Sequence, residues 1–227
     1  MKTHLLGLLL VVGLLMGSPA SLFAQVPDLE GNYIANGGST TWDDWEFTEA
    51  GKEAFDTYNF ATDDPALQCL ASSWQRVWLN PNVLVRITQE EDQVLLWYEW
   101  GDLDRRIPLI DPTVANPARG SIEGQPALGH YAGWYDGDTL VIDTIDIAPG
   151  YVSTMSEFAG TPQSNRMHTV ERLTRDGDLL TIETTHMDPA NYRKPFMVTK
   201  TYPRSNFEVL RYGCNPDDAA VVEPGAN

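Results

Sequence analysis

The stretch LGHYAGWYDGDTLVIDTI, residues 128–145, places Asp136 and Gly137 between two runs that are rich in aromatic and β-branched residues. An Asp-Gly pair in this setting is a strong signal for a β-hairpin, because glycine readily adopts the positive φ that a tight two-residue turn requires. The sequence therefore predicts that residues 128–135 form a strand and pair with residues 138–145.

The same signal returns at Asp176 and Gly177, which predict a second hairpin between residues 166–174 and residues 178–187. β-branched and aromatic residues predict four further strands, at residues 83–87, 93–100, 105–110 and 196–202. Eight strands with tight connections favour an all-β fold, a single antiparallel meander β-barrel. A β-sandwich is the alternative arrangement.

One short helix is expected before these strands. Apolar residues recur at helical spacing over residues 49–57, and Thr48 has the side chain of an N-cap. No boundary between domains is visible in the later sequence. Residues 25–227 are therefore predicted to form one β-barrel domain, with a flexible acidic tail from about residue 215.

The first segment has the layout of a secretory signal peptide. An apolar run at residues 5–16 follows a short polar start, and small or turn-forming residues come next. Cleavage after Ala24 is expected, with cleavage after Ala20 as the alternative. Residues 1–24 thus predict a periplasmic or secreted protein. A retained N-terminal anchor is the other interpretation, but the run is short for a membrane span.

The composition excludes some partners. The 227 residues include 32 acidic and 15 basic side chains, which gives a formal net charge of −17. Such a chain cannot neutralise a nucleic-acid backbone or an anionic membrane surface. At 42% hydrophobic residues, the chain can bury a core. The acidic runs at residues 43–44, 63–64 and 90–92 are interpreted as solvated loops, because their spacing does not suit calcium.

Cys69 and Cys214 are the two cysteines of the chain. An even count in an exported protein favours a disulfide between them. A metal-binding pair is the less favoured alternative, because neither cysteine has a second cysteine or histidine at ligand spacing.

Several motifs together resemble a large, mostly uncharacterised family of exported bacterial proteins. Residues 129–144 are similar to the family's segment GHSxGxWEGDTLVVDT, and further similarity lies at residues 48–54, 64–69, 98–99, 105–107, 164–172, 188–195 and 214. The resemblance implies export and a lipocalin-like or calycin-like barrel, and little about a reaction. The family's extra histidines before the serine are absent here, where residues 160–163 read GTPQ.

Three residues are the candidates for acid/base chemistry. Leu128, His130 and Ala132 occupy every second position of a predicted strand and so share one mostly apolar face. Glu171 lies within a strand of similar pattern. The side chains of His130 and Glu171 are therefore both predicted to face the core. Tyr98 is the candidate for polarising a substrate. A buried carboxylate needs a cation near it, and Arg105 or Arg106 is expected to supply one. A structural ion pair and a core histidine are the alternative interpretations.

Aromatic and basic side chains are the candidates for binding a ligand in the barrel interior. They are Arg105, Arg106, Trp97, Trp100, Trp134 and His168. Aromatic residues also fill ordinary cores, which is the other interpretation. His168 is expected near the solvent at one end of its strand, and His186 is interpreted as incidental.

The sequence favours an exported barrel that binds a small apolar or aromatic molecule in its interior. The alternative is a cofactor-independent isomerase, hydratase or cyclase that uses His130 and Glu171. A structural or interaction protein with a filled barrel is a third class. No cofactor or metal is expected, because phosphate-loop, Rossmann, nucleophile-elbow and paired-cysteine motifs do not occur in the sequence.

Overall fold

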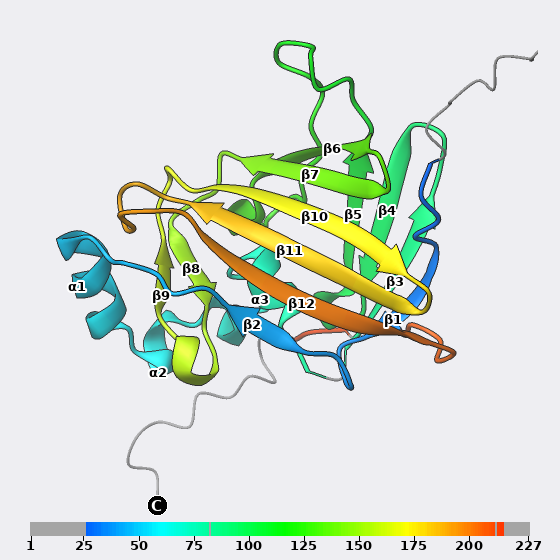
Figure 1. Ribbon diagram of the computed structural model, residues 1–227. Helices are drawn as coiled ribbons and strands as arrows, with labels where there is room; N and C mark the ends of the chain where they lie inside the picture. The colour runs from blue at the N-terminus through cyan, green and yellow to red at the C-terminus, as the bar shows by residue number, and fades with distance from the viewer. Residues whose placement is uncertain (1–25, 82, 212, 216–227) are drawn as a thin grey trace, which may run out of the picture.

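The computed structural model describes residues 26–81, 83–211 and 213–215, and Figure 1 shows their arrangement. The predicted signal peptide and nearly all of the predicted flexible tail lie outside the described residues. The strands are β1 Gly31–Ile34, β2 Thr40–Trp42, β3 Leu84–Gln89, β4 Gln93–Tyr98, β5 Leu103–Pro108, β6 His130–Asp136, β7 Thr139–Ile145, β8 Gly150–Ser153, β9 Thr161–Gln163, β10 His168–Asp176, β11 Leu179–Met187 and β12 Phe196–Ser205. The α-helices are α1 Glu49–Thr57, α2 Phe60–Asp63 and α3 Trp74–Trp78, and the 3-10 helices are η1 Pro65–Gln68, η2 Trp100–Asp102, η3 Pro126–Leu128 and η4 Ser156–Phe158.

Ten of the strands form one large sheet. Nine follow the order β5-β4-β3-β1-β12-β11-β10-β7-β6, and β2 adds to β12. All of these pairings are antiparallel. The short strands β8 and β9 pair separately. The predicted all-β antiparallel fold is therefore confirmed, and the large sheet is continuous, in contrast to the two facing sheets of a sandwich.

Both predicted hairpins are confirmed. His130 pairs with Ile145 at one end of the β6–β7 ladder, and Gly137 in the turn has a φ of 63°. The β10–β11 ladder has Gly177 in its turn, with a φ of 56°. Each of the eight predicted strands corresponds to an observed one, because their alternating or β-branched patterns match the strand period.

The two edges of the large sheet come together at one point. Leu109, just after β5, forms a single parallel bridge with Gly133 in β6. The backbone N–H of Ile110 donates to the Gly133 carbonyl at 2.8 Å. No ladder joins β5 to β6 in the described residues, so the closed barrel stays a prediction.

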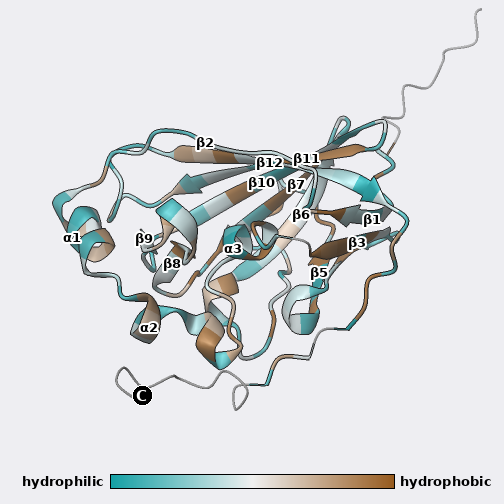
Figure 2. Cartoon of the chain, turned by 90° about the horizontal axis from the view of Figure 1, so that it is seen from below, coloured by the Kyte–Doolittle hydropathy of each residue, from teal (hydrophilic) through white to brown (hydrophobic). Residues whose placement is uncertain are grey.

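The predicted helix is α1, with the expected bounds. The Thr48 side chain accepts a hydrogen bond from the backbone N–H of Gly51 at 3.0 Å, as an N-cap does. A second helix, α3, is not predicted from the sequence. It has five residues and is capped by Ser73, which accepts from the N–H of Arg76 at 2.9 Å. Figures 1 and 2 show α3 in the hollow of the curved sheet, where it brings Trp74 and Trp78 into the core.

Buried apolar side chains form two clusters. The larger one lies between the sheet and α3. The second contains Tyr192, Phe196 and Val198, with Trp42 and Trp45 packed against it. A disulfide joins Cys69 to Cys214, with 5.7 Å between the α-carbons, which confirms that prediction. In the part of the chain that the structure describes, no helix is long and apolar enough to span a membrane.

Candidate functional site

Glu171 and Arg105 form an ion pair in the interior. Glu171 lies on β10 and Arg105 on β5, and neither side chain is exposed to solvent. The guanidinium donates to both carboxylate oxygens, from Nη1 at 3.1 Å and from Nη2 at 2.5 Å. Burial acts against the charged guanidinium, but the adjacent Glu171 carboxylate more than offsets it, so the pKa of Arg105 is raised. The predicted partner of Glu171 is thus confirmed as Arg105.

Aromatic side chains of α3 and β6 pack against this ion pair. The indole N–H of Trp78 donates to Oε1 of Glu171 at 2.7 Å. The Arg105 guanidinium lies 3.9 Å from the ring centroid of Trp74 and 4.8 Å from that of Tyr131. The pair is therefore packed among protein groups, which is the arrangement expected for a structural ion pair.

Tyr98 belongs to the same buried cluster. Its ring centroid lies 4.9 Å from that of Trp78 and 5.5 Å from that of Trp74. Burial raises the pKa of Tyr98, although the nearby Arg105 charge lowers it in part. In the described residues, the Tyr98 hydroxyl and Nε of Arg105 have no hydrogen-bond partner with acceptable geometry.

His130 does not face this interior, and the prediction that it does is wrong. Its side chain is 51% exposed, and Nδ1 lies 3.5 Å from a carboxylate oxygen of Asp146. The inward residue of β6 is the buried Tyr131, whose ring contacts that of Trp74 at 5.6 Å. A shift of one residue exchanges the faces of a strand. His130 and Glu171 therefore lie on opposite faces of the sheet.

A misleading pattern caused this error. Ala132 is buried although it shares the outer face with His130, so both faces of β6 are covered. Gly120 in the preceding long loop bridges to Tyr131. Arg119 donates to the His130 carbonyl at 3.4 Å from the same loop. Leu128 belongs to η3 and lies outside the strand, and Ala132 is buried on the outer face, so alternation alone cannot identify the inner face.

His168 lies on the outer side of β10, as expected, with a side chain 40% exposed. Its Nε2 contacts a carboxylate oxygen of Asp143, while Nη2 of Arg119 donates to the other oxygen at 2.6 Å. Burial alone would raise the pKa of Asp143, but these hydrogen bonds and charges outweigh it and lower that pKa. Both carboxylate oxygens of Asp143 are thus paired within the protein.

The predicted ligand-binding residues do not share one cavity. Trp97 and Arg106 lie together on the outer side of β4 and β5, in a depression of about 300 Å³. The guanidinium groups of Arg86 and Arg211 lie over the Trp97 ring, 5.0 Å and 5.2 Å from its centroid. Trp100 packs against the main core from η2, and Trp134 is partly buried on β6. Arg105, as described above, is in the interior.

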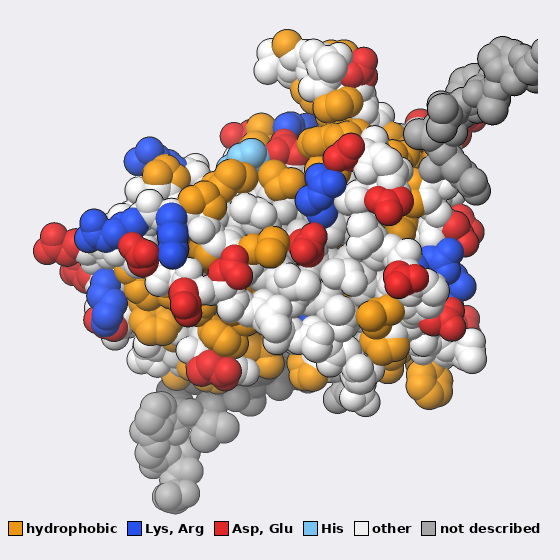
Figure 3. Space-filling model, viewed as in Figure 1, with side chains coloured by type: hydrophobic (Ala, Val, Ile, Leu, Met, Phe, Trp, Pro, Cys, Tyr) orange, Lys and Arg blue, Asp and Glu red, His pale blue; other side chains and the backbone are white. Residues whose placement is uncertain are grey.

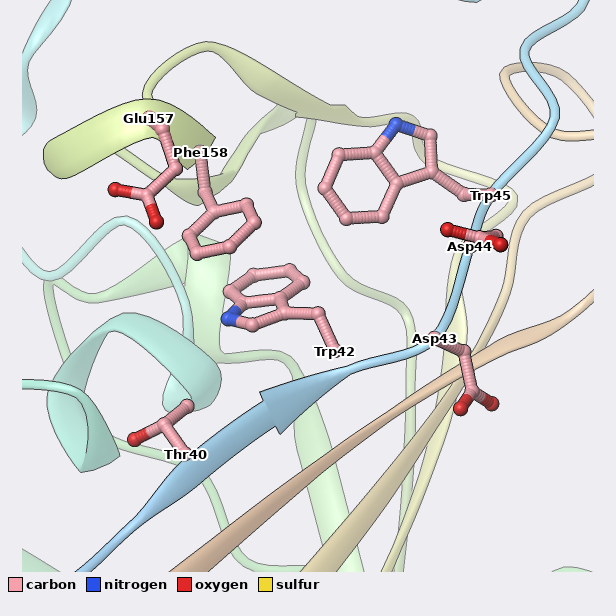
Figure 4. A pocket seen from close by; sticks show the side chains of 7 residues that line it. All are labelled: Thr40, Trp42, Asp43, Asp44, Trp45, Glu157 and Phe158. Carbon is pink, nitrogen blue, oxygen red and sulfur yellow. The ribbon is translucent and has the colours of Figure 1, made fainter.

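A different pocket combines aromatic rings with carboxylates. It has a volume of about 470 Å³, and Figure 4 shows the side chains that line it. We call it the Trp42 pocket, and it is lined by Thr40, Trp42, Asp43, Asp44, Trp45, Glu157 and Phe158. β2 and the residues that follow it supply one side, and η4 supplies the other. Figure 3 shows apolar and acidic side chains next to each other on the surface around β2.

The aromatic rings of this pocket are held by one another and by the second core. Trp42 stacks on Phe158, with ring centroids 4.3 Å apart and an interplanar angle of 16°. Trp45 meets both rings edge-on, at 5.4 Å from Trp42 and 5.7 Å from Phe158. Phe196 lies beneath, with its centroid 5.7 Å from that of Trp45. The rings therefore form a fixed apolar floor.

Carboxylates give the pocket its charge. Asp43 continues the pairing of β2, because its N–H donates to the Met197 carbonyl at 2.9 Å and its side chain accepts from the Met197 N–H at 3.2 Å. Asp44 and Glu157 are exposed and form no ion pair among the described residues. A second hollow of about 280 Å³ adjoins the pocket and shares Thr40, Trp42, Glu157 and Phe158 with it. Apolar rings bordered by carboxylates suit an organic cation with an apolar body.

Sequence reasoning misses this pocket. It interprets residues 43–44 as a solvated loop, and it does not predict η4. The available signal is the order Trp-Asp-Asp-Trp at residues 42–45, in which two large aromatic side chains flank two carboxylates. Among the described residues, no group of three or more histidine, cysteine, aspartate or glutamate side chains is placed to hold a metal ion.

Comparisons with known proteins give weak likenesses. No family model and no curated protein matches the chain. A secretary abundant heat soluble (SAHS) protein from Ramazzottius varieornatus is similar in structure, at 12% identity and a TM-score of 0.39, over 80% of this chain and 98% of that one. A point mutant of the fluorescent protein UnaG is similar at 10% identity and a TM-score of 0.36, over 79% of this chain and 97% of that one. At these scores, neither likeness carries an argument about function.

Proposed function

We propose that this protein binds a small organic cation with an apolar body in the Trp42 pocket. The observation that carries the proposal is the set of contacting rings of Trp42, Trp45 and Phe158, bordered by exposed carboxylates. The carboxylates beside the rings attract a cation by Coulombic interaction, and the ring edges give its apolar body a surface on which to bury. The net charge of −17 also favours cations over anions.

This proposal keeps small-molecule binding but moves it from the interior to the surface. The interior next to Glu171 is occupied by Trp74 and Trp78, which leaves the ion pair a structural role. Acid/base catalysis by His130 and Glu171 has no support from the geometry, because they lie on opposite faces. Export, membership of the exported bacterial family and a closed barrel remain part of the proposal, on the sequence grounds given above.

A pair of matched ligands tests the proposal. Phenylethylamine and 2-phenylethanol share an aromatic body and differ in charge. We expect isothermal titration calorimetry to show tighter binding of the amine. Added salt should weaken it, because exposed charges are screened. Equal binding of the two compounds would refute a cation site.

Variants of the pocket locate the binding. Asp44→Asn and Glu157→Gln remove exposed charges, and each should weaken amine binding about two- to fivefold, the range for an exposed ion pair. Glu91→Gln, an exposed carboxylate in the β3–β4 turn, is the matched control and should bind like the wild type. Trp45→Leu should weaken binding further, with its melting temperature as a check on folding. Wild-type affinity in all three pocket variants would place any binding elsewhere.

A further inference from the structure

We infer that the Trp42 pocket takes a linear diamine, with an ammonium group at each end of an aliphatic chain. The inference rests on the proposed function and narrows the class of organic cation. Three features of the pocket support it. They are the placement of the carboxylates, the apolar floor between them, and the ion pairs or burial that keep lysines from pairing with these carboxylates.

The carboxylates lie on two sides of the aromatic rings. Figure 4 shows Glu157 beyond Phe158 on one side, and Asp44 next to Trp45 on the other. They come from separate elements, since Glu157 belongs to η4 whereas Asp44 follows β2. A single ammonium group close to one carboxylate would leave the other without a partner. A ligand with two separated charges satisfies both.

The surface between the carboxylates is apolar. The ring of Phe158 contacts both tryptophans, at 4.3 Å and 5.7 Å between centroids, so the floor is continuous. The faces of Trp42 are covered by Phe158 and, at 6.3 Å and an interplanar angle of 13°, by Phe196. A flat ligand thus cannot stack on Trp42. A methylene chain can still lie across the ring edges and bury apolar surface there.

Among the described residues, Asp44 and Glu157 form no ion pair with a lysine or an arginine, and the lysines have other surroundings. Lys194, on the loop before β12, pairs with Glu46 at 3.2 Å. Lys52 of α1 pairs with Asp56. Lys200 is paired in register with Thr40 but is buried in the sheet, and burial lowers its pKa. The two carboxylates are therefore open to charges from a ligand.

A diamine and an amino alcohol of equal length provide the test. Hexamethylenediamine and 6-amino-1-hexanol differ only in that a hydroxyl replaces one ammonium group. Calorimetry on the wild-type protein should show the diamine binding about three- to tenfold more tightly, because the symmetric ligand has two equivalent orientations and makes one more exposed ion pair. A ratio of about two, the orientation factor alone, would overturn the inference.

The carboxylate variants sharpen this test. In Glu157→Gln the ratio of the two affinities should fall to about two, because the carboxylate on the η4 side is lost and one ammonium group has no partner. In Asp44→Asn the ratio should fall less far, because Asp43 still lies on that side of the pocket. In Glu91→Gln the ratio should stay at the wild-type value. A ratio that stays high in both pocket variants would also overturn the inference.

Two further outcomes separate this inference from the proposed function. If the diamine binds only about twofold more tightly, as the orientation factor predicts, and the pocket variants weaken both ligands, the pocket binds organic cations and the diamine inference alone fails. If neither compound binds, both proposals fail. Calcium chloride at the diamine concentration is the control for a general acidic surface. It should displace little of the diamine, and full displacement by calcium would overturn the inference.

Discussion

Replacing Glu171 by glutamine should destabilise the protein strongly and leave ligand binding unchanged. The Glu171 carboxylate accepts three hydrogen bonds, two from Arg105 and one from the indole of Trp78, with no exposure to solvent. Glutamine has nearly the same volume, so the change creates no cavity. It removes the charge that balances a buried guanidinium. Breaking a buried ion pair in this way costs about 3–5 kcal/mol.

An arginine guanidinium is not deprotonated in proteins, so Arg105 keeps its charge when its partner is lost. Urea unfolding, followed by tryptophan fluorescence with the disulfide intact, measures the cost. For a slope near 2 kcal/mol per molar urea, the midpoint should fall by roughly 2 M. Diamine binding by the folded fraction should match the wild type, because the Trp42 pocket is separate from the ion pair.

A double variant provides the control. In Arg105→Met combined with Glu171→Gln, the buried charge is gone and the amide still accepts from Trp78. The large cost of breaking the pair comes from the uncompensated buried charge, which the double variant lacks, so most of the lost stability should return. A loss below about 1 kcal/mol in Glu171→Gln would contradict the structural role of the pair. So would a loss of diamine binding at unchanged stability, which would indicate a functional carboxylate.

Three further predictions concern other parts of the fold. Burial lowers the pKa of His186 to about 3, so the unfolded chain takes up the proton first as the pH falls. The free energy of unfolding should therefore be fully retained above about pH 6.5 and fall by up to ~1.4 kcal/mol per pH unit towards pH 3. His186→Gln should reduce that fall in urea titrations, and identical pH profiles would contradict the assignment. The double variant Cys69→Ser, Cys214→Ser should lose on the order of 4–5 kcal/mol of unfolding free energy, because the disulfide closes a loop with a sequence separation of 145. An unchanged melting temperature would contradict this stabilising role of the disulfide. Gly137→Val should lower the free energy of unfolding by about 1–3 kcal/mol, measured by urea unfolding, because valine is strained at a φ of 63°. Nothing lies within 4 Å of the added Cβ, so the cost comes from the backbone alone. A cost near zero would show that the turn relaxes.

The strands and the ion pair could be predicted because their signals are local or obligatory. An Asp-Gly turn fixes a hairpin through the backbone of Gly137, whatever the rest of the chain does. Glu171 needs a cation once its strand is placed, and Arg105 is one of two candidates in the sequence. The face of His130 could not be predicted, because Ala132 is buried on the outer side of β6 and Leu128 lies outside the strand.

The helix α3 and the Trp42 pocket depend on contacts that leave little trace in the sequence. A five-residue helix is too short for a periodic pattern, and its only local sign is the N-cap Ser73. The pocket joins residues 42–45 to η4, which lies more than a hundred residues later in the chain. Spatial proximity of that kind follows from the sheet order and from the second core.

The tryptophans lie in two different places, which is why we propose a ligand site on the surface and not in the interior of the sheet. Trp74 and Trp78 fill the hollow of the sheet and satisfy Glu171, so this interior is an ordinary packed core with a buried charge pair. Trp42 and Trp45 instead lie at the boundary between the second core and solvent. Each ring packs against Phe196, which fixes its position at little cost in entropy, and exposed carboxylates lie at the margins of the pocket. A rigid aromatic floor with charges at its margins is pre-organised for a cation, whereas the filled interior would have to unpack before it could admit a ligand.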